Sequence, residues 1–161
     1  MNAMADDNEF ALEYLLFRVG REEYGVDIRK VQEIRSYEVT TQIVNSPAYL
    51  KGVINLRGLV VPMVDLRIKF GQQAAQYDQQ TVTVVLQLNG QMTGVVVDGV
   101  SDVAAISPAQ IKPVPQLTRG ENTDYILGLA SVDERIVILV DMEGMLGAEG
   151  LVAIEAAAVS C

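Results

Sequence analysis

The sequence predicts an all-β protein with a few short helices, built from two related halves. Short apolar segments rich in Val, Ile, Leu and Tyr alternate with Gly, Pro, Asn and Asp, a pattern typical of barrels and sandwiches. A weak internal repeat also relates the first half of the chain to the second. Half of the 161 residues are hydrophobic, so the chain has enough apolar side chains to form a core.

Nine segments are predicted to be strands because each is short, apolar and bounded by turn residues. Asn89-Gly90 separates two of them and favours a two-residue hairpin, since both residues tolerate a positive φ. Arg57-Gly58 and Asp133-Glu134 predict two further tight turns. In order, the segments are Tyr14–Val19, Tyr24–Ile28, Val39–Val44, Val53–Leu56, Leu59–Leu66, Thr81–Leu88, Met92–Val97, Ile126–Val132 and Arg135–Val140.

Helical signals are few and short. Asp27 is a candidate N-cap for a helical segment that extends to Ile34. Ser46-Pro47 and Ser107-Pro108 each combine a capping residue with a first-turn proline, and Gly52 is expected to close the first of these turns.

The chain divides near its middle at a polar, glutamine-rich connector, Gln72–Gln80. The globular part is expected to span residues 13–148, and strand exchange between its halves is left open. The first half is expected at about residues 13–79 and the second at about 80–148, between a flexible N-terminus (1–12) and an alanine-rich C-terminal helix or tail (149–161).

The internal repeat has two parts. Tyr24–Ile34 resembles Thr93–Val103, and Leu50–Leu66 resembles Leu127–Met142. In the second pair, a glycine and the aspartate that follows the strand have the same spacing in both copies. Two similar halves of this size are each too small for a large core, so they are expected to pack together.

The junction between the halves is expected to be apolar. Leu59–Val64 is apolar on both faces, whereas a strand with one wet face alternates polar and apolar residues. Pro62 has no N–H to donate, so this strand is predicted to lie at a sheet edge or to bulge there.

The composition excludes several kinds of catalysis. The chain has no histidine, and its one cysteine is Cys161 at the end, so Ser-His-Asp and Cys-His mechanisms and an intrachain disulfide are impossible. Carboxylates alone can hydrolyse glycosides, and this alternative stays open for Asp65, Asp98, Asp102 and Asp141. Asp65 and Asp141 end equivalent strands, where capping of the next turn is the favoured interpretation.

The charge distribution argues against nucleic acid as a partner. The net charge is −9, of which −8 belongs to residues 71–161. Such a surface repels phosphate backbones, so an oligonucleotide-binding barrel is the weakest alternative. The glycines match no nucleotide-binding motif, and no cofactor or metal is expected. The apolar runs are shorter than the roughly 20 residues that cross a membrane. The acidic N-terminus lacks signal-peptide features, which predicts a cytoplasmic location.

Three blocks of the sequence carry a family resemblance: Tyr24–Ile28 with Lys30–Arg35, Gly52–Gly58 with Val61–Arg67, and Gly94–Val103. They resemble the CheW family of chemotaxis coupling proteins. The resemblance extends in order over nearly the whole globular part, from about residue 13 to residue 146, and the spacing of the blocks makes it specific.

The resemblance implies a pair of five-stranded SH3-like barrels that exchange strands. It also implies a non-catalytic adaptor in bacterial chemotaxis, which binds the regulatory domain of the histidine kinase CheA and the cytoplasmic tip of a helical chemoreceptor. Such an adaptor is cytoplasmic and is recruited to membrane-associated receptor arrays without inserting into the membrane. With 161 residues, the chain has no room for an additional kinase ATP-binding domain or receiver domain.

The resemblance also implies two sets of binding residues. An ion pair between Glu33 and Arg57 is expected at the edge of the receptor-binding surface. Ile28 and Val31, like Val100 and Val103, are three residues apart and are predicted to share one face of a helical turn, although core packing is an equally good interpretation of the valines. The receptor-binding candidates are Ile28, Val31, Glu33, Arg57, Val100 and Val103, and the kinase-binding candidates are Lys51 and Gly52.

Overall fold

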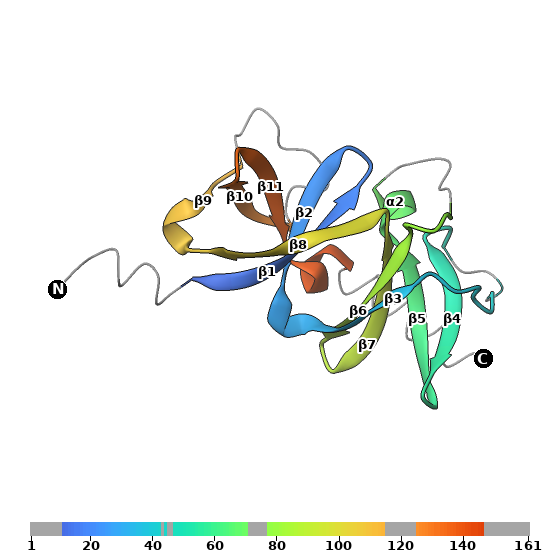
Figure 1. Cartoon of the computed structure of the whole chain (residues 1–161). Helices are drawn as coiled ribbons and strands as arrows, with labels where there is room; N and C mark the ends of the chain where they lie inside the picture. Colours follow the sequence, from blue (N-terminus) through green and yellow to red (C-terminus); the bar gives the residue numbers. More distant parts are fainter. Residues whose placement is uncertain (1–10, 43, 45–46, 71–76, 115–124, 147–161) are drawn as a thin grey trace.

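The structure, a computed structural model, describes residues 11–42, 44, 47–70, 77–114 and 125–146 (Figure 1). Eleven strands in these residues form a six-stranded sheet, ordered β8-β1-β2-β11-β10-β9, and a five-stranded sheet, ordered β3-β6-β7-β5-β4. The strands are β1 (Leu12–Val19), β2 (Glu22–Asp27), β3 (Val31–Ser36), β4 (Leu50–Leu56), β5 (Leu59–Asp65), β6 (Val82–Leu88), β7 (Gln91–Val97), β8 (Gly99–Ile106), β9 (Ile111–Lys112), β10 (Ile126–Val132) and β11 (Arg135–Val140).

The helical elements of the described residues are short. They are the 3-10 segments Ile28–Lys30 and Pro108–Gln110, the helix α2 (Leu66–Lys69) and a helix at residues 142–146. None of them is long and apolar enough to cross a membrane. The predicted C-terminal helix and flexible N-terminus lie outside the described residues, except for residues 11 and 12.

The sheets exchange strands between the two halves of the chain. β1 pairs with β8 and β2 pairs in parallel with β11, although β8 and β11 come from the second half. β6 and β7, also from the second half, pair with β3 and β5 of the first. The fold is therefore the expected all-β pair of SH3-like units with strand exchange. One sheet has six strands where five were expected, because the two-residue strand β9 adds to its edge. The residue boundaries of the two halves stay a prediction.

Local turn chemistry agrees with the sequence prediction. The three predicted turns carry positive φ angles at Arg57 (51°), Asn89 (50°) and Asp133 (49°) and at the residue that follows each of them. Eight of the nine predicted segments are strands; Ile126–Val132 and Arg135–Val140 have the predicted bounds, and the other six have shifted ends. The ninth, Val39–Val44, is wrong: among its described residues, which leave out residue 43, only Thr41 forms a β-bridge, to Val53.

The long helical segment predicted after Asp27 is also wrong. The Asp27 carboxylate does accept a hydrogen bond from the Arg29 N–H at 2.9 Å, but the helix is a single 3-10 turn. β3 follows at once because its backbone pairs with β6. Long-range pairing thus overrides the local helix signal.

Of the two serine-proline signals, the second is confirmed. Ser107 precedes a 3-10 segment, and its N–H donates to the Gln110 side chain at 2.8 Å in a capping box. Ser46 lies outside the described residues, and the Pro47 carbonyl accepts from the Leu50 N–H in a turn. Gly52 does not close that turn but lies in β4.

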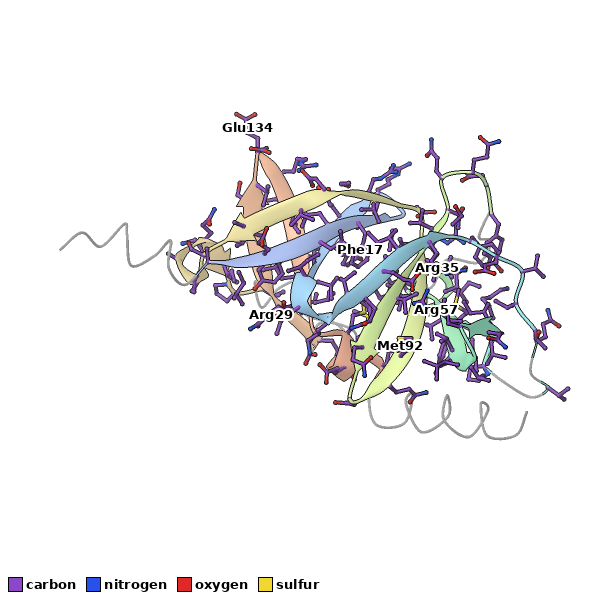
Figure 2. All side chains as sticks on the ribbon, turned by 60° about the horizontal axis from the view of Figure 1, so that its bottom comes forward. Phe17, Arg29, Arg35, Arg57, Met92 and Glu134 are labelled. Atoms are coloured by element: carbon purple, nitrogen blue, oxygen red, sulfur yellow. The ribbon has the colours of Figure 1, made fainter. Side chains whose placement is uncertain are left out.

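The largest hydrophobic core lies between the two sheets, which explains why they form one body. Phe17 and Val26 of the six-stranded sheet and Val64 and Leu86 of the five-stranded sheet belong to this cluster. Two smaller clusters are drawn from one sheet each. The expected apolar junction is therefore present, and Phe17 lies at its centre (Figure 2).

The strand Leu59–Val64 departs from its prediction in two ways. Its first two residues are exposed, and burial begins at Val61. Pro62 is not in an edge strand, because β5 lies between β7 and β4. β5 pairs with β7 only from Met63 onward. The β5–β7 pair therefore requires no hydrogen bond from the N–H that Pro62 lacks.

Candidate functional site

The predicted ion pair between Glu33 and Arg57 is present in the structure. Arg57 lies in the turn between β4 and β5, and its Nη2 is 2.5 Å from Glu33 Oε1 of β3. The Asn55 side chain accepts from the Gly58 N–H at 2.8 Å and so fixes the turn that presents Arg57. This turn therefore reaches the edge strand β3.

Glu33 is shared between two arginines, Arg35 and Arg57, both of which are labelled in Figure 2. Arg35 Nη1 is 3.2 Å from Glu33 Oε2, and Arg35 also binds Glu38. The hydrogen bond from Arg57, followed by that from Arg35, lowers the pKa of the Glu33 carboxyl. Exposed pairs of this kind add little to stability but constrain which partner fits.

The apolar candidates come from both sheets. Ile28, Val31 and Val100 are half-buried and pack against the core between the sheets, while Val103 is 46% exposed. Ile28 begins a 3-10 turn that the Val31 N–H closes onto the Ile28 carbonyl, and β3 begins at Val31. The expected helical geometry is wrong for Val100 and Val103, which lie in β8. The β1–β8 register shifts after Val100, so spacing along the chain does not give their relative orientation.

The kinase-binding candidates Lys51 and Gly52 lie in β4, an edge strand of the five-stranded sheet. Gly52 has a φ of +137°, and a Cβ there would clash with the Thr41 carbonyl oxygen. Thr41 and Val53 exchange backbone hydrogen bonds of 2.9 Å, which bring the chain after β3 onto β4. Gly52 is thus required by this close approach. The Lys51 ammonium lies 5.5 Å from the centre of the Tyr77 ring.

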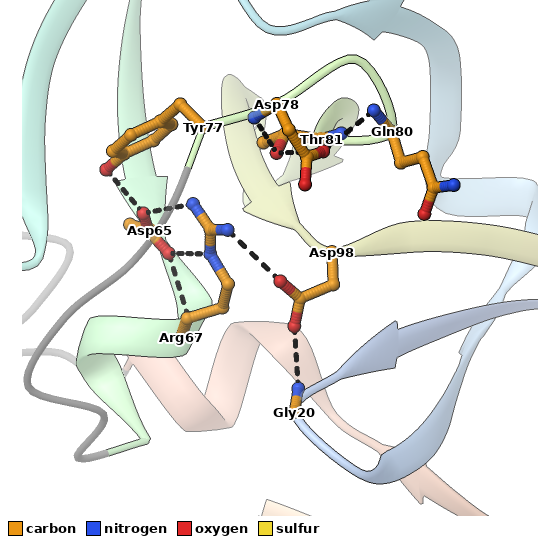
Figure 3. A network of polar contacts seen from close by, with 8 residues as sticks. All are labelled: Gly20, Asp65, Arg67, Tyr77, Asp78, Gln80, Thr81 and Asp98. Carbon is orange, nitrogen blue, oxygen red and sulfur yellow. Dashed lines mark hydrogen bonds and ion pairs between the residues drawn. The ribbon is translucent and has the colours of Figure 1, made fainter.

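A buried polar network lies behind this edge and was not predicted from the sequence (Figure 3). Arg67 is 1% exposed, and its Nε and Nη2 each lie 3.0 Å from the Asp65 carboxylate. Its Nη1 is 3.1 Å from Asp98, and the Tyr77 hydroxyl donates to Asp65 at 2.6 Å. Burial opposes the charge on Arg67, but its bonds to Asp65 and Asp98 outweigh burial and raise its pKa. Burial and the bond to Asp65 raise the pKa of Tyr77.

The capping role predicted for Asp65 is confirmed. Its carboxylate accepts from the Arg67 N–H at 2.9 Å at the start of α2. The spacing of Asp65 and Arg67 in one sequence block was the available signal for their pairing. No feature of the sequence indicated that Arg67 is buried, because arginine side chains usually lie at the surface.

Three of the four carboxylates considered for hydrolysis lie beside arginines. Asp65 and Asp98 both bind Arg67, and Asp102 lies 3.7 Å from Arg135. Among the described residues, a cavity of about 150 Å³ is lined by apolar and aromatic side chains, those of Tyr24, Phe70, Ile126, Val140 and Met145. In the described part of the chain, no group of acidic or cysteine residues could hold a metal ion.

Comparison with known proteins gives one consistent family. The model of the CheW-like domain matches residues 13–150. The chemotaxis protein CheW of Klebsiella aerogenes is 48% identical over 143 residues, which cover 89% of this chain and 86% of that protein. A probable chemotaxis protein CheW of Rhizobium etli is 34% identical over 86% of this chain and 89% of its own length.

A solved structure has the same fold. The scaffolding protein TtCheW from Thermoanaerobacter tengcongensis superposes with a TM-score of 0.78 at 28% identity, over 87% of this chain and 95% of that one. Sequence and fold thus agree over the whole described body, and the chain belongs to the CheW family of chemotaxis proteins.

Proposed function

We propose that this protein is a non-catalytic adaptor that couples chemoreceptors to the histidine kinase CheA. The observation that carries the proposal is the Glu33–Arg57 ion pair, which places a charged edge on the five-stranded sheet, on the same strand as the half-buried Val31. The membership of the chain in the CheW family supports a scaffolding role in chemotaxis.

The receptor would bind at a surface that both sheets build. We call the residues Ile28, Val31, Glu33, Arg57, Val100 and Val103 the candidate receptor surface. A receptor tip is helical, and a helix needs apolar contacts along one face with polar groups beside them. Ile28, Val31 and Val100 provide apolar groups that rest on the core between the sheets, and Val103 is exposed. Glu33 and Arg57 provide the polar edge.

The kinase would bind at the edge of the five-stranded sheet. Lys51 and Gly52 lie in β4, whereas Val100 and Val103 belong to β8 of the other sheet. Of the candidate receptor surface, Arg57 adjoins β4, five residues beyond Gly52. Surfaces that do not overlap would permit both partners to bind at once. Coupling of the receptor to the kinase then requires no chemical step. An adaptor that contacts two kinase states differently shifts the populations of those states. Binding of the receptor tip would recruit the adaptor to membrane-associated arrays.

Substitution of Arg57 by alanine is expected to weaken receptor binding about tenfold and to leave kinase binding unchanged. The substitution removes one partner of Glu33 and leaves the core intact, because Arg57 is exposed. Isothermal titration calorimetry with a receptor-tip fragment and with the CheA regulatory domain measures both affinities. Arg21→Ala, an exposed arginine in the β1–β2 turn, is the control. Equal losses for both partners, or no loss for the receptor, would contradict the proposal.

A further inference from the structure

One carboxylate connects the two sheets at the point where the chain passes between them. Asp98 lies between β7 of the five-stranded sheet and β8 of the six-stranded sheet. Its Oδ1 is 3.1 Å from Arg67 Nη1, and its Oδ2 accepts from the Gly20 N–H at 2.7 Å (Figure 3). Its own N–H donates to the Arg18 carbonyl at 2.9 Å. Asp98 thus joins α2 to the β1–β2 turn of the other sheet.

The contact is directional, unlike the apolar core that surrounds it. Hydrophobic burial holds two sheets together without selecting one relative orientation. The Arg67 guanidinium is planar and donates to the Asp65 carboxylate from two nitrogens, Nε and Nη2. The direction of its third nitrogen, Nη1, toward Asp98 is therefore fixed. Buried ion pairs are weak sources of stability, and geometric specificity is their best-supported use.

β8 begins at Gly99, directly after this ion pair, and carries Val100 and Val103. In Figure 1, β8 starts next to α2 and runs along β1. The two charged residues of the candidate receptor surface belong to the five-stranded sheet. Glu33 lies in β3, and Arg57 lies in the turn between β4 and β5. The relative orientation of the sheets therefore sets the distance between the two parts of that surface.

We propose that Arg67 and Asp98 are positioning residues, whose ion pair fixes β8 relative to the five-stranded sheet and so keeps the candidate receptor surface in one geometry. The effect on receptor binding rests on the proposed function, whereas the effect on sheet orientation does not. Kinase binding depends on β4 in this account. The Asp98 carboxylate bonds to Arg67 and Gly20 and not to β4, so loss of its charge is expected to leave kinase binding unchanged.

The test is Asp98→Asn, which removes the charge but keeps an oxygen for the Gly20 N–H. Asp98 is 33% exposed and the Asp65–Arg67 pair stays intact, so the fold is expected to survive. Asp78→Asn is the matched control, because the Asp78 carboxylate bonds to residues of its own turn, Gln80 and Thr81, while its charge also acts on Arg67. The control therefore separates the loss of a nearby negative charge from the loss of the Arg67–Asp98 ion pair. Arg67→Lys, which keeps the charge but loses the planar fork, is a second variant if the first is unstable.

Two measurements are made on each variant. Spin labels at the exposed positions Gln87 of β6 and Ser131 of β10, in a Cys161→Ser background, report the distance between the sheets by pulsed electron paramagnetic resonance. Calorimetry gives the affinities for the receptor-tip fragment and the CheA regulatory domain.

For Asp98→Asn we expect a broader or shifted distance distribution, receptor binding about tenfold weaker and kinase binding unchanged, with Asp78→Asn like the wild type. A distance distribution that is the same in Asp98→Asn and in the wild type would overturn the positioning role. If the wild type itself binds no receptor fragment, the proposed function fails, and the distance distributions decide the positioning role by themselves.

Discussion

Replacement of Arg67 by methionine is expected to lower the free energy of unfolding by about 3–5 kcal/mol. Methionine fills much of the space of the arginine stem, so the loss does not come from a large cavity. The loss comes from Asp65, a fully buried carboxylate that keeps the Tyr77 hydroxyl but loses the guanidinium that binds both of its oxygens. An unpaired buried charge is among the few single changes with so large an effect.

Urea denaturation followed by far-ultraviolet circular dichroism measures this loss. Arg135→Met is the matched control, because Arg135 is 42% exposed and its Nη1 lies 3.1 Å from Glu23. The control is expected to cost less than about 1 kcal/mol, as exposed pairs do. Equal losses for the two substitutions would contradict this prediction. They would mean that the buried pair of Arg67 and Asp65 adds no more to the free energy of unfolding than an exposed pair does.

Replacement of Gly52 by alanine is expected to cost about 3 kcal/mol. Backbone strain at a positive φ contributes about 1–3 kcal/mol, and overpacking a tight site contributes a similar amount. The added Cβ would collide with the Thr41 carbonyl oxygen and separate the chain after β3 from β4.

Gly58→Ala separates these two contributions. Gly58 also has a positive φ, +87°, but a Cβ there meets no atom within 4 Å. The control is expected to cost only about 1 kcal/mol from backbone strain. If both alanine variants unfold at the same urea concentration, the close approach of Thr41 to Gly52 has no energetic importance.

The sequence predicted those features of the fold that are encoded locally. Asn89-Gly90 gives a hairpin because its two residues tolerate positive φ wherever they occur. β3 and β8 were missed because each carries polar or charged residues at exposed positions, which obscure the apolar pattern of a strand. Both strands depend on long-range partners, β6 and β1.

Strand exchange and the buried network required more than local patterns. Periodicity shows which side of a strand is buried but does not identify the neighbouring strand, so exchange followed only from the family resemblance. The same resemblance predicted the contact between Glu33 and Arg57, which the structure contains. The pairing of Arg67 with Asp98 joins residues 31 positions apart, and no feature of either residue indicated the other.

One molecule of this protein is expected to bind receptor and kinase at the same time, on different surfaces. Sedimentation velocity of the protein mixed with a receptor-tip fragment and the CheA regulatory domain tests it most directly. We predict a complex that contains all three components and that does not form when this protein is omitted. Displacement of one partner by the other would contradict the account, because it would mean that both bind the same surface.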